Sequence, residues 1–253
     1  MQKLSVIICC YNERDTIAQI IAQTKGVDLG HGWEREIIVV DNFSSDGTRE
    51  ILQKLDDPDL RIFYHDVNKG KGASIRTGIS KMTGTYFFIQ DADSEYDPRQ
   101  QRDFTAYAAR TNAAAVFGSR VLGGKIRSKY KSTLLANRLL TLMTNLLFGG
   151  NLTDVATASK MVRADVAHAL NLTCSGFDLD FELPNKILLS GHKIEEIPID
   201  YDPRTYAEGK KIRSSDAIKA VFTMLRDRLG ISPALKSKRS QAPVEADNIN
   251  VNS

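Results

Sequence analysis

The segment FFIQDADSEY at residues 87–96 determines how this 253-residue chain folds and which chemistry it supports. The apolar run at 86–89 is typical of a buried strand. Asp91, Asp93 and Glu95 follow at alternate positions, and buried carboxylates are costly unless they are paired or bind a metal. We therefore predict that the strand ends here and that the three side chains converge on one point beyond the sheet.

Three convergent carboxylates suit a hard divalent cation. Mg²⁺ and Mn²⁺ prefer oxygen ligands, and in proteins they usually also hold substrate phosphates. The spacing therefore predicts Asp91, Asp93 and Glu95 as ligands of Mg²⁺ or Mn²⁺. The alternative is a turn with solvated carboxylates, because acidic turns are common.

The composition is that of an ordinary globular protein, with 42% hydrophobic and 26% charged residues. Cys9, Cys10 and Cys174 lack a ligand-like spacing, so we expect a reducing compartment rather than a disulfide framework or a zinc site. No apolar run approaches the roughly 18 residues of a membrane-spanning helix, and no signal peptide is recognisable at the start. We expect a cytoplasmic location, either free or at the cytoplasmic face of a membrane.

The charge is unevenly distributed, although the net value is only +3. Residues 104–153 contain no acidic residue and these basic ones: Arg110, Arg120, Lys125, Arg127, Lys129, Lys131 and Arg138. Such a stretch indicates an anionic partner at that surface, and the alternative is a solvated basic face.

Apolar strands and helical patterns alternate four times within the first hundred residues, with strands expected at 4–10, 36–40, 60–65 and 86–89. This alternation predicts a parallel, doubly wound α/β sheet with right-handed crossovers. Ligands bind beyond the carboxyl ends of such strands. Polar residues gather at those ends: Tyr11, Asn12, Glu13, Asp41, Asn68, Lys69, Gly70, Lys71, Gly72, Asp91 and Asp93. The sequence therefore predicts one site along this edge of the sheet.

The glycine-rich turn at 68–72 matches neither a dinucleotide fingerprint nor a phosphate-binding P-loop. We expect Gly70 and Gly72 to permit a close backbone approach, while Lys71 or Arg76 meets an anion.

The second half contains further predicted elements and a polar end. We expect strands at 113–117, 157–162 and 194–201, the last at a sheet edge because it contains Pro198. Helices are expected at 97–110, 132–148, 177–189 and 215–229, and a disordered tail at 231–253. The leucine-rich helix at 132–148 is too polar to span a bilayer. It either packs on the sheet or a dimer partner, or lies in a membrane interface.

Four motifs in this order resemble family-2 glycosyltransferases of the GT-A fold: CCYNE (9–13), VVDNFSSDGT (39–48), NKGKGASIRTG (68–78) and QDADSEYDP (90–98). The spacing DADxEYDP at 91–98, followed by GSR at 118–120, makes the chain similar to the dolichol-phosphate mannose synthase branch. The resemblance covers residues 4 to about 215 and implies a GT-A fold, a doubly wound, mostly parallel sheet flanked by helices. We expect one domain over 1–230, with a nucleotide-sugar and metal-binding half at 1–120 and an acceptor half at 121–230.

The strand ends and the resemblance together assign candidate roles. The expected nucleotide-binding residues are Tyr11, Asn12, Glu13, Asp41, Asn68, Lys71, Gly72, Arg76, Asp91 and Ala92. The expected acceptor or phosphate ligands are Arg120, Lys131, Arg204 and Lys211, and the expected catalytic residues are Asp93, Asp154 and Arg204. Asn42 stands where many members of the family have a second aspartate, so the choice between UDP and GDP stays open. Asp180 or Glu182 approaches the acceptor, or else caps a helix.

The resemblance implies a metal-dependent, inverting hexosyltransferase that moves a sugar from a nucleotide-diphosphate sugar to a polyprenyl phosphate of the dolichol or undecaprenyl type. Asp154 would act as a base only if the acceptor were a hydroxyl. The alternatives are transfer to a soluble or polysaccharide hydroxyl, and a nucleotide-sugar-binding subunit without turnover. Nucleic-acid binding is not expected, because the basic stretch lacks interleaved aromatic residues apart from Tyr130. Peripheral membrane contact fits a lipid acceptor, and the oligomeric state stays open.

Overall fold

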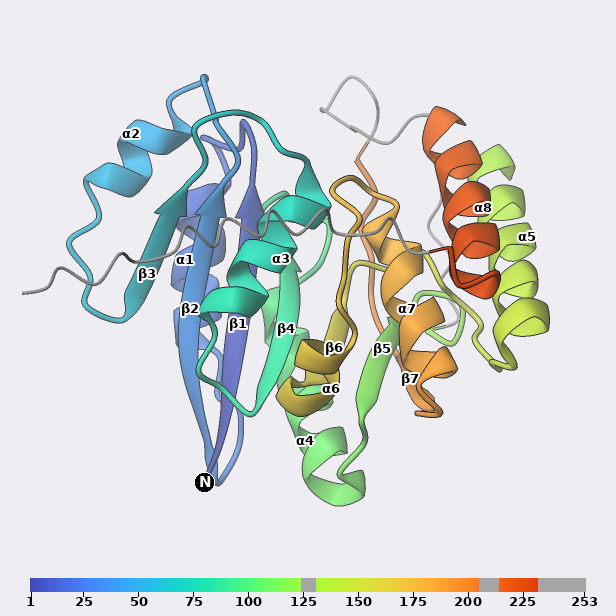
Figure 1. Cartoon of the computed structure of the whole chain (residues 1–253). Coiled ribbons are helices and arrows are strands. Elements are labelled where there is room, and N and C mark those ends of the chain that lie inside the picture. The colour runs from blue at the N-terminus through green and yellow to red at the C-terminus, as the bar shows by residue number, and fades with distance from the viewer. Residues whose placement is uncertain (124–130, 205–213, 232–253) are drawn as a thin grey trace, which may run out of the picture.

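A mixed sheet flanked by helices forms the described part of the chain, which comprises residues 1–123, 131–204 and 214–231 of a computed structural model (Figure 1). The predicted tail falls almost wholly outside these residues. The strands are β1 (Gln2–Cys10), β2 (Trp33–Asp41), β3 (Leu60–Tyr64), β4 (Tyr86–Asp91), β5 (Ala115–Ser119), β6 (Lys160–Arg163) and β7 (Ile194–Pro198).

The helices follow the predicted order, with one short addition, α6. They are α1 (Ile17–Gly26), α2 (Thr48–Gln53), α3 (Lys71–Lys81), α4 (Gln101–Thr111), α5 (Lys131–Phe148), α6 (Ala164–Ala169), α7 (Leu179–Leu189) and α8 (Ser214–Arg228). A 3₁₀ turn, η1 (Pro98–Gln100), precedes α4, and the Asp97 side chain caps it by accepting a hydrogen bond from the Arg99 backbone N–H.

The strand order is β3-β2-β1-β4-β6-β5-β7. β1 pairs in parallel with β2 and β4, β2 with β3, and β5 with β7. β6 runs antiparallel to both of its neighbours, β4 and β5. The prediction of a doubly wound, mostly parallel sheet is confirmed, and β7, which contains Pro198, lies at the predicted edge.

Helices cover both faces of the sheet, which is why its central strands are continuous apolar runs. Alternate residues of β4 show this: Phe88 packs in a cluster with α1 and α4, while Phe87 packs in a second cluster with α3, α6 and α7. Figure 1 shows α3, α6 and α7 in front of the strands and α1 behind them.

A third apolar cluster lies beyond the sheet, where α5 and α8 run side by side against α7 (Figure 1). Leu140 and Phe148 of α5 meet Ala220 and Met224 of α8 there. The inner face of the leucine-rich helix is therefore core, as the packing interpretation predicted, but its partners are other helices. Within the described residues, no helix is both long and apolar enough to cross a membrane.

The register of the strands brings the functional ends together. Cys9 of β1 lies opposite Asp91 of β4, and Cys10 lies opposite Asp41 of β2. The side chains that follow these residues therefore emerge from adjacent strands at one edge of the sheet.

Candidate active site

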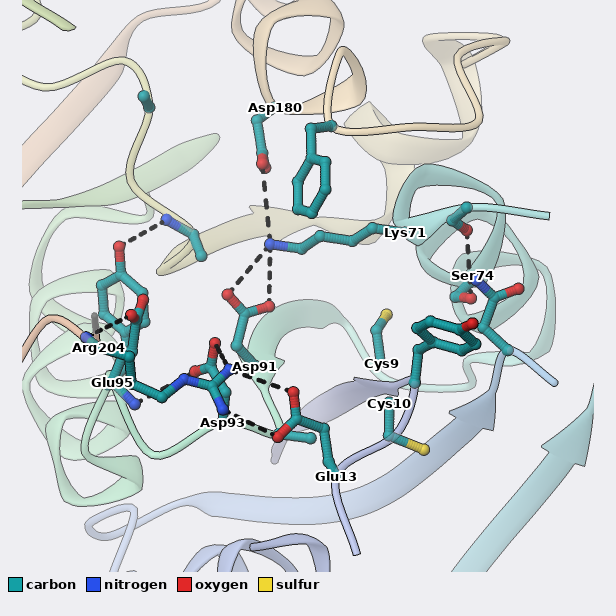
Figure 2. Close-up of a pocket in the computed structure, with 18 of the residues that line it drawn as sticks. Cys9, Cys10, Glu13, Lys71, Ser74, Asp91, Asp93, Glu95, Asp180 and Arg204 are labelled. Carbon is teal, nitrogen blue, oxygen red and sulfur yellow. Dashed lines mark hydrogen bonds and ion pairs between the residues drawn. The ribbon is translucent and has the colours of Figure 1, made fainter. Parts of the chain in front are cut away.

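A cavity of about 540 Å³ opens at the carboxyl ends of β1 and β4, at the predicted edge of the sheet (Figure 2). Much of the predicted set lines it: Tyr11, Glu13, Asn68, Lys71, Asp91, Ala92, Asp93, Glu95, Arg120 and Arg204. The prediction missed other lining residues, among them Cys9, Cys10, Tyr96, Phe177 and Tyr201. Tyr96 could have been found from sequence, because it directly follows Glu95 in the polar segment already assigned to this edge.

Lys71, the first residue of α3, neutralises the carboxylate that ends β4. Its Nζ lies 2.9 Å from Asp91 Oδ1 and 3.8 Å from Asp180 Oδ2 (Figure 2). The ammonium also lies 5.9 Å from the centre of the Phe177 ring. Lys71 therefore provides a fixed cation inside the cavity, and its contact with a nucleotide stays a prediction.

Arg204 joins two carboxylates from different strand ends. Its guanidinium donates to Asp93 Oδ2 at 2.7 Å and to Glu13 Oε2 at 3.1 Å (Figure 2). These ion pairs raise the pKa of Arg204 against the lowering effect of burial. The guanidinium is thus a permanent cation, and it lies beside the acidic residues that were predicted to bind metal.

Glu95 binds the segment that carries Arg204. Tyr201 Oη donates to Glu95 Oε2 at 3.0 Å, and the Arg204 backbone N–H donates to Oε1 at 2.7 Å. In the described part of the chain, no three His, Cys, Asp or Glu side chains are arranged to hold a metal. Asp91, Asp93 and Glu95 thus line one cavity, but they do not form a three-carboxylate metal cluster there, because Glu95 has these other partners. Their role as metal ligands stays a prediction.

Asp91 and Asp93 nevertheless have the chemistry of a divalent cation site. Burial, followed by the negative charges of Asp91 and Glu95, raises the pKa of Asp93 to about 7, although Arg204 acts in the opposite direction. A hard cation beside these carboxylates would offset their repulsion, and carboxylate oxygen is the ligand that Mg²⁺ and Mn²⁺ prefer. The two aspartates fit such an ion, and Glu95 fits a supporting role.

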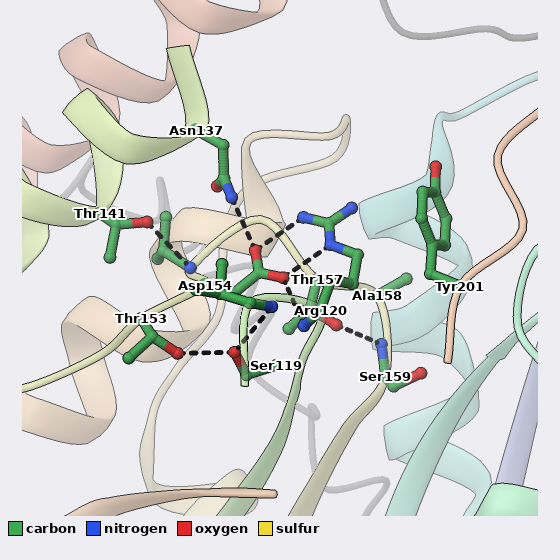
Figure 3. Close-up of polar contacts among 12 residues, drawn as sticks. Ser119, Arg120, Asn137, Thr141, Thr153, Asp154, Thr157, Ala158, Ser159 and Tyr201 are labelled. Carbon is green, nitrogen blue, oxygen red and sulfur yellow. Dashed lines mark hydrogen bonds and ion pairs between the residues drawn. The ribbon is translucent and has the colours of Figure 1, made fainter. Parts of the chain in front are cut away.

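Arg120 and Asp154 form a second, differently built pair in the wall of the cavity (Figure 3). Arg120 Nε donates to Asp154 Oδ2 at 2.6 Å and Nη2 donates to Oδ1 at 2.7 Å. Asn137 Nδ2 of α5 donates to the same Oδ1 at 2.9 Å. The Arg120 guanidinium also lies 5.0 Å from the centre of the Tyr201 ring.

The position of Asp154 corrects its expected role as a base. The residue is fully buried and does not line the cavity. Burial alone would raise its pKa, but the charge and hydrogen bonds of Arg120 outweigh burial and hold the pKa of Asp154 below its ordinary value. A carboxylate locked by a guanidinium is a poor proton acceptor. Asp154 is placed to orient Arg120.

The glycine-rich turn approaches another part of the chain, rather than leaving its backbone open to a nucleotide. A Cβ at Gly70 would lie 2.3 Å from Ser175 O, and one at Gly72 would lie 2.7 Å from Gly176 O. The Gly72 backbone N–H donates to Gly176 O. Close approach therefore explains both glycines, as predicted, but Gly72 does not line the cavity. Arg76 does not line it either, and its guanidinium donates to Thr173 O.

Two residues that were expected to contact the nucleotide, Asn12 and Asp41, form hydrogen bonds with the segment that follows β2. Asp41 is fully buried, and Arg49 Nε donates to its Oδ2 at 2.6 Å. Asn12 Oδ1 accepts a hydrogen bond from the Ser45 backbone N–H at 2.9 Å. Neither residue lines the cavity, so their contact with a nucleotide stays a prediction.

Asn42 lines the cavity, whereas the preceding residue, Asp41, does not. Its Oδ1 accepts from the Lys69 backbone N–H at 2.8 Å and lies 3.0 Å from His65 Nδ1. Its Nδ2 donates to Asn68 Oδ1 at 2.8 Å. The amide oxygens are thus engaged, and this corner of the cavity offers amide N–H groups. Of the remaining predictions, Lys211 and the side chain of Lys131 lie outside the described residues.

A doubly wound sheet with an acidic pair at its strand ends is the architecture of GT-A glycosyltransferases. The chain matches the family model of glycosyl transferase family 2 over residues 5–170, more than half of its length. The chain therefore belongs to glycosyl transferase family 2, and the predicted class of enzyme, a glycosyltransferase, is confirmed.

The chain is similar to two curated proteins named for polyprenyl-phosphate substrates. It is 25% identical to an undecaprenyl-phosphate mannosyltransferase of Micrococcus luteus over 218 residues, which are 82% of this chain and 87% of that protein. It is 26% identical to a dolichol-phosphate mannosyltransferase of Pyrococcus furiosus over 214 residues, 82% of this chain but 59% of that protein. The chain thus spans about three fifths of the length of the second relative.

A solved structure supports the fold assignment. Glucosyl-3-phosphoglycerate synthase of Mycobacterium tuberculosis, in complex with Mn²⁺, uridine diphosphate and phosphoglyceric acid, superimposes with a TM-score of 0.66 at 18% identity. The match covers 92% of this chain and 80% of the other. At this identity the likeness establishes the fold alone.

Proposed function

We propose that this chain is an inverting, metal-dependent hexosyltransferase that moves a sugar from a nucleotide-diphosphate sugar to a polyprenyl phosphate. The observation that carries the proposal is the strand-end cavity, in which Asp91 and Asp93 face the cations Lys71 and Arg204. The names of the two curated relatives support a polyprenyl phosphate as the acceptor.

The donor would bind at the acidic pair. Asp91 and Asp93 would hold Mg²⁺ or Mn²⁺, and the bound ion would neutralise charge on the diphosphate. The Mn²⁺ and uridine diphosphate in the related synthase structure support this arrangement. Glu95 would keep Arg204 beside the pair through the Tyr201 and backbone contacts.

The acceptor chemistry needs positioning more than proton removal. An oxygen of the acceptor phosphate attacks the anomeric carbon, and the bond from that carbon to the diphosphate oxygen breaks with its electron pair leaving on the nucleoside diphosphate. A phosphate monoester is already anionic at neutral pH, so no base is required. Lys71 and Arg204 supply fixed positive charge where negative charge develops.

The location follows from the substrates. A nucleotide sugar is soluble, whereas a polyprenyl phosphate resides in a bilayer. The enzyme would therefore work at the cytoplasmic face of a membrane, which is one of the two locations that we expected from the sequence.

Asp180 favours a second candidate, transfer to a hydroxyl acceptor. The residue lines the cavity, and its buried Oδ1 has no hydrogen-bond partner within the described structure, although Lys160 Nζ lies 3.5 Å away. A carboxylate placed in this way could accept a proton from an attacking hydroxyl. The Asp180→Asn variant separates the candidates: near-complete loss of transfer fits a hydroxyl acceptor, and a small loss fits a phosphate.

The direct test uses purified protein, Mn²⁺, a panel of UDP- and GDP-sugars and a short polyprenyl phosphate. We expect a lipid-linked sugar that forms only with metal and is abolished by Asp93→Ala. Release of nucleotide without modification of the lipid would leave the donor half intact and point to a soluble glycan acceptor. Failure to bind any donor would contradict the assignment of the cavity.

A further inference from the structure

We infer that the outer face of α5 and α8 is a docking surface for an anionic lipid bilayer. The inner faces of both helices are buried in the third apolar cluster, but their outer faces remain apolar and exposed. Each carries a stripe of four large side chains: Leu135, Leu139, Leu142 and Leu146 on α5, and Ile218, Phe222, Leu225 and Leu229 on and directly after α8. We call these eight residues the outer stripes.

The two outer stripes have the same geometry. In each, the residues follow one another at intervals of four, three and four, which places them on one face of a helix. Their exposed fractions range from 46% to 76%. Since α5 and α8 pack side by side (Figure 1), the stripes belong to one end of the molecule. Several large apolar side chains exposed at one end of a molecule mark an interaction site.

The exposed charges on these helices identify the partner. Over the described side chains of α5 and α8, every exposed charged residue is basic: Arg138, Lys219 and Arg228. Asp216, which is only 17% exposed, lies 3.8 Å from Lys219 and offsets part of this charge. Arg138 lies three residues after Leu135 and four before Leu142, so it shares their face. An apolar face bordered by cations is the pattern of a helix that lies in the interface of an anionic membrane.

A second copy of the chain fits the same face less well. A twofold contact through this face would bring the cations of one copy, Arg138 and Arg228 among them, close to the cations of the other, which disfavours association. Anionic head groups would complement these charges instead. The choice of a bilayer also rests in part on the proposed function, because a polyprenyl phosphate has to be reached in a membrane.

Two polar links connect the docking surface to the cavity. On α5, Asn137 donates to Asp154, which in turn holds Arg120 in the cavity wall (Figure 3). On α8, Arg226 Nη2 donates to Glu182 Oε1 at 3.1 Å, and Glu182 accepts from the Thr173 backbone N–H at 2.9 Å. The segment after Thr173 reaches Gly70 and Gly72 beside Lys71. Docking at the outer stripes would therefore hold the cavity near the lipid surface.

The test is co-sedimentation of the full chain with phosphatidylcholine vesicles, with and without phosphatidylglycerol. We expect binding to the anionic vesicles, weakened by salt. Leu142→Glu and Phe222→Glu should each weaken it by about tenfold or more, since each removes one large apolar group from the buried contact. The matched control is Leu189→Glu on α7, a leucine outside the outer stripes whose exposed fraction of 47% is close to the 53% of Leu142. This variant should bind as the unchanged protein does.

Three outcomes would overturn the inference. These are absence of binding to anionic vesicles, equal binding of the stripe variants, or self-association that Phe222→Glu abolishes without any vesicle binding. The assay contains neither donor nor acceptor, so it is independent of catalysis. Vesicle binding without sugar transfer would contradict only the proposed function. Transfer to a short polyprenyl phosphate by a chain that ignores vesicles would contradict only the docking surface.

Discussion

Two aspartate–arginine pairs at the cavity have almost the same ion-pair distance, yet the pKa values of their aspartates shift in opposite directions. Asp93 lies 2.7 Å from Arg204, and Asp154 lies 2.6 Å from Arg120. The pKa of Asp93 is raised to about 7, because burial and two further carboxylates outweigh its arginine, whereas the pKa of Asp154 is lowered. The surroundings of a pair therefore decide its role: the first is an incompletely neutralised cluster that suits a ligand, and the second is a closed structural unit.

Replacing Asp93 should have the largest effect on activity and little effect on stability. We expect Asp93→Asn to lower kcat/KM for transfer by about a thousandfold, because a charged ligand to the donor site is lost. The free energy of unfolding should stay unchanged or rise slightly, because the uncharged side chain of the variant is no longer repelled by Asp91 and Glu95. Steady-state kinetics with Mn²⁺ and urea unfolding test both.

The matched control for this change is Asp97→Asn, four residues along the same segment and outside the cavity. Asparagine also caps helix starts, so the variant should keep both activity and stability. A stability loss in Asp93→Asn as large as its activity loss would mean that the Asp93 pair is structural, like the Asp154 pair.

Replacing Asp154 should have the opposite signature. Asp154→Asn leaves the Arg120 guanidinium without its counter-charge, and breaking a buried pair in this way should cost about 3 kcal/mol of unfolding free energy. Loss of activity should follow the lost orientation of Arg120. Denaturant unfolding measures the first effect, and the pH profile of the remaining activity distinguishes positioning from proton transfer. A changed acid limb with unchanged stability would restore Asp154 as the base.

A surface pair provides the control for Asp154. Asp165 lies 2.7 Å from Arg163 but is two thirds exposed, so Asp165→Asn should change the unfolding free energy by no more than about 0.5 kcal/mol. The contrast with Asp154→Asn isolates the contribution of burial, since both variants break an aspartate–arginine pair of nearly equal length.

Glu182 extends the comparison to a third buried carboxylate. Burial would raise its pKa, but hydrogen bonds from Lys186, Thr173 and Cys174 lower it to about 2. Because the folded pKa lies below the ordinary value of 4.5, the stabilisation is complete above pH 4.5 and is lost as the pH falls toward 2.

The corresponding variant is Glu182→Gln. We expect it to lower the unfolding free energy by about 2 kcal/mol at neutral pH, because Lys186 loses its counter-charge and Arg226 keeps only Asp227. The difference from the unchanged protein should shrink below pH 4.5. Urea unfolding between pH 7 and pH 3.5 measures it, and a difference that is constant over this range would contradict the prediction.

The sequence predicts the strand-end wall of the cavity well because that wall is built from local patterns. An apolar strand followed by Asp91 and Asp93 can be recognised within ten residues, and the alternation of strands and helices places its end at the same edge of the sheet as the end of β1. The edge position of Pro198 follows from a similar local rule, the missing backbone donor of proline.

The contacts within the opposite wall of the cavity could not be predicted from sequence, because they join distant segments of the chain. The antiparallel direction of β6 depends on tertiary packing that has no local signal. The ion pair between Asp154 and Arg120 joins residues 34 positions apart in the sequence, and the hydrogen bond from Tyr201 to Glu95 joins residues 106 positions apart. Periodicity also identified the leucine-rich helix, but not the matching stripe on α8 or the packing that leaves both stripes exposed.

Apart from the two control variants, the smallest expected effect comes from Asn137, which supports Asp154 from α5. Asn137→Ala removes the hydrogen bond to Asp154 Oδ1, but it also removes a buried Asn137 Oδ1 that lacks a partner within the described structure. The two terms oppose each other, so we expect a loss of about 1 kcal/mol in denaturant unfolding. In Asn137→Asp, a second carboxylate would meet Asp154, and the loss should be larger. If Asn137→Asp were more stable than Asn137→Ala, the positive charge of Arg120 would not be fully neutralised by Asp154. The Asp154 pair would then resemble the Asp93 cluster.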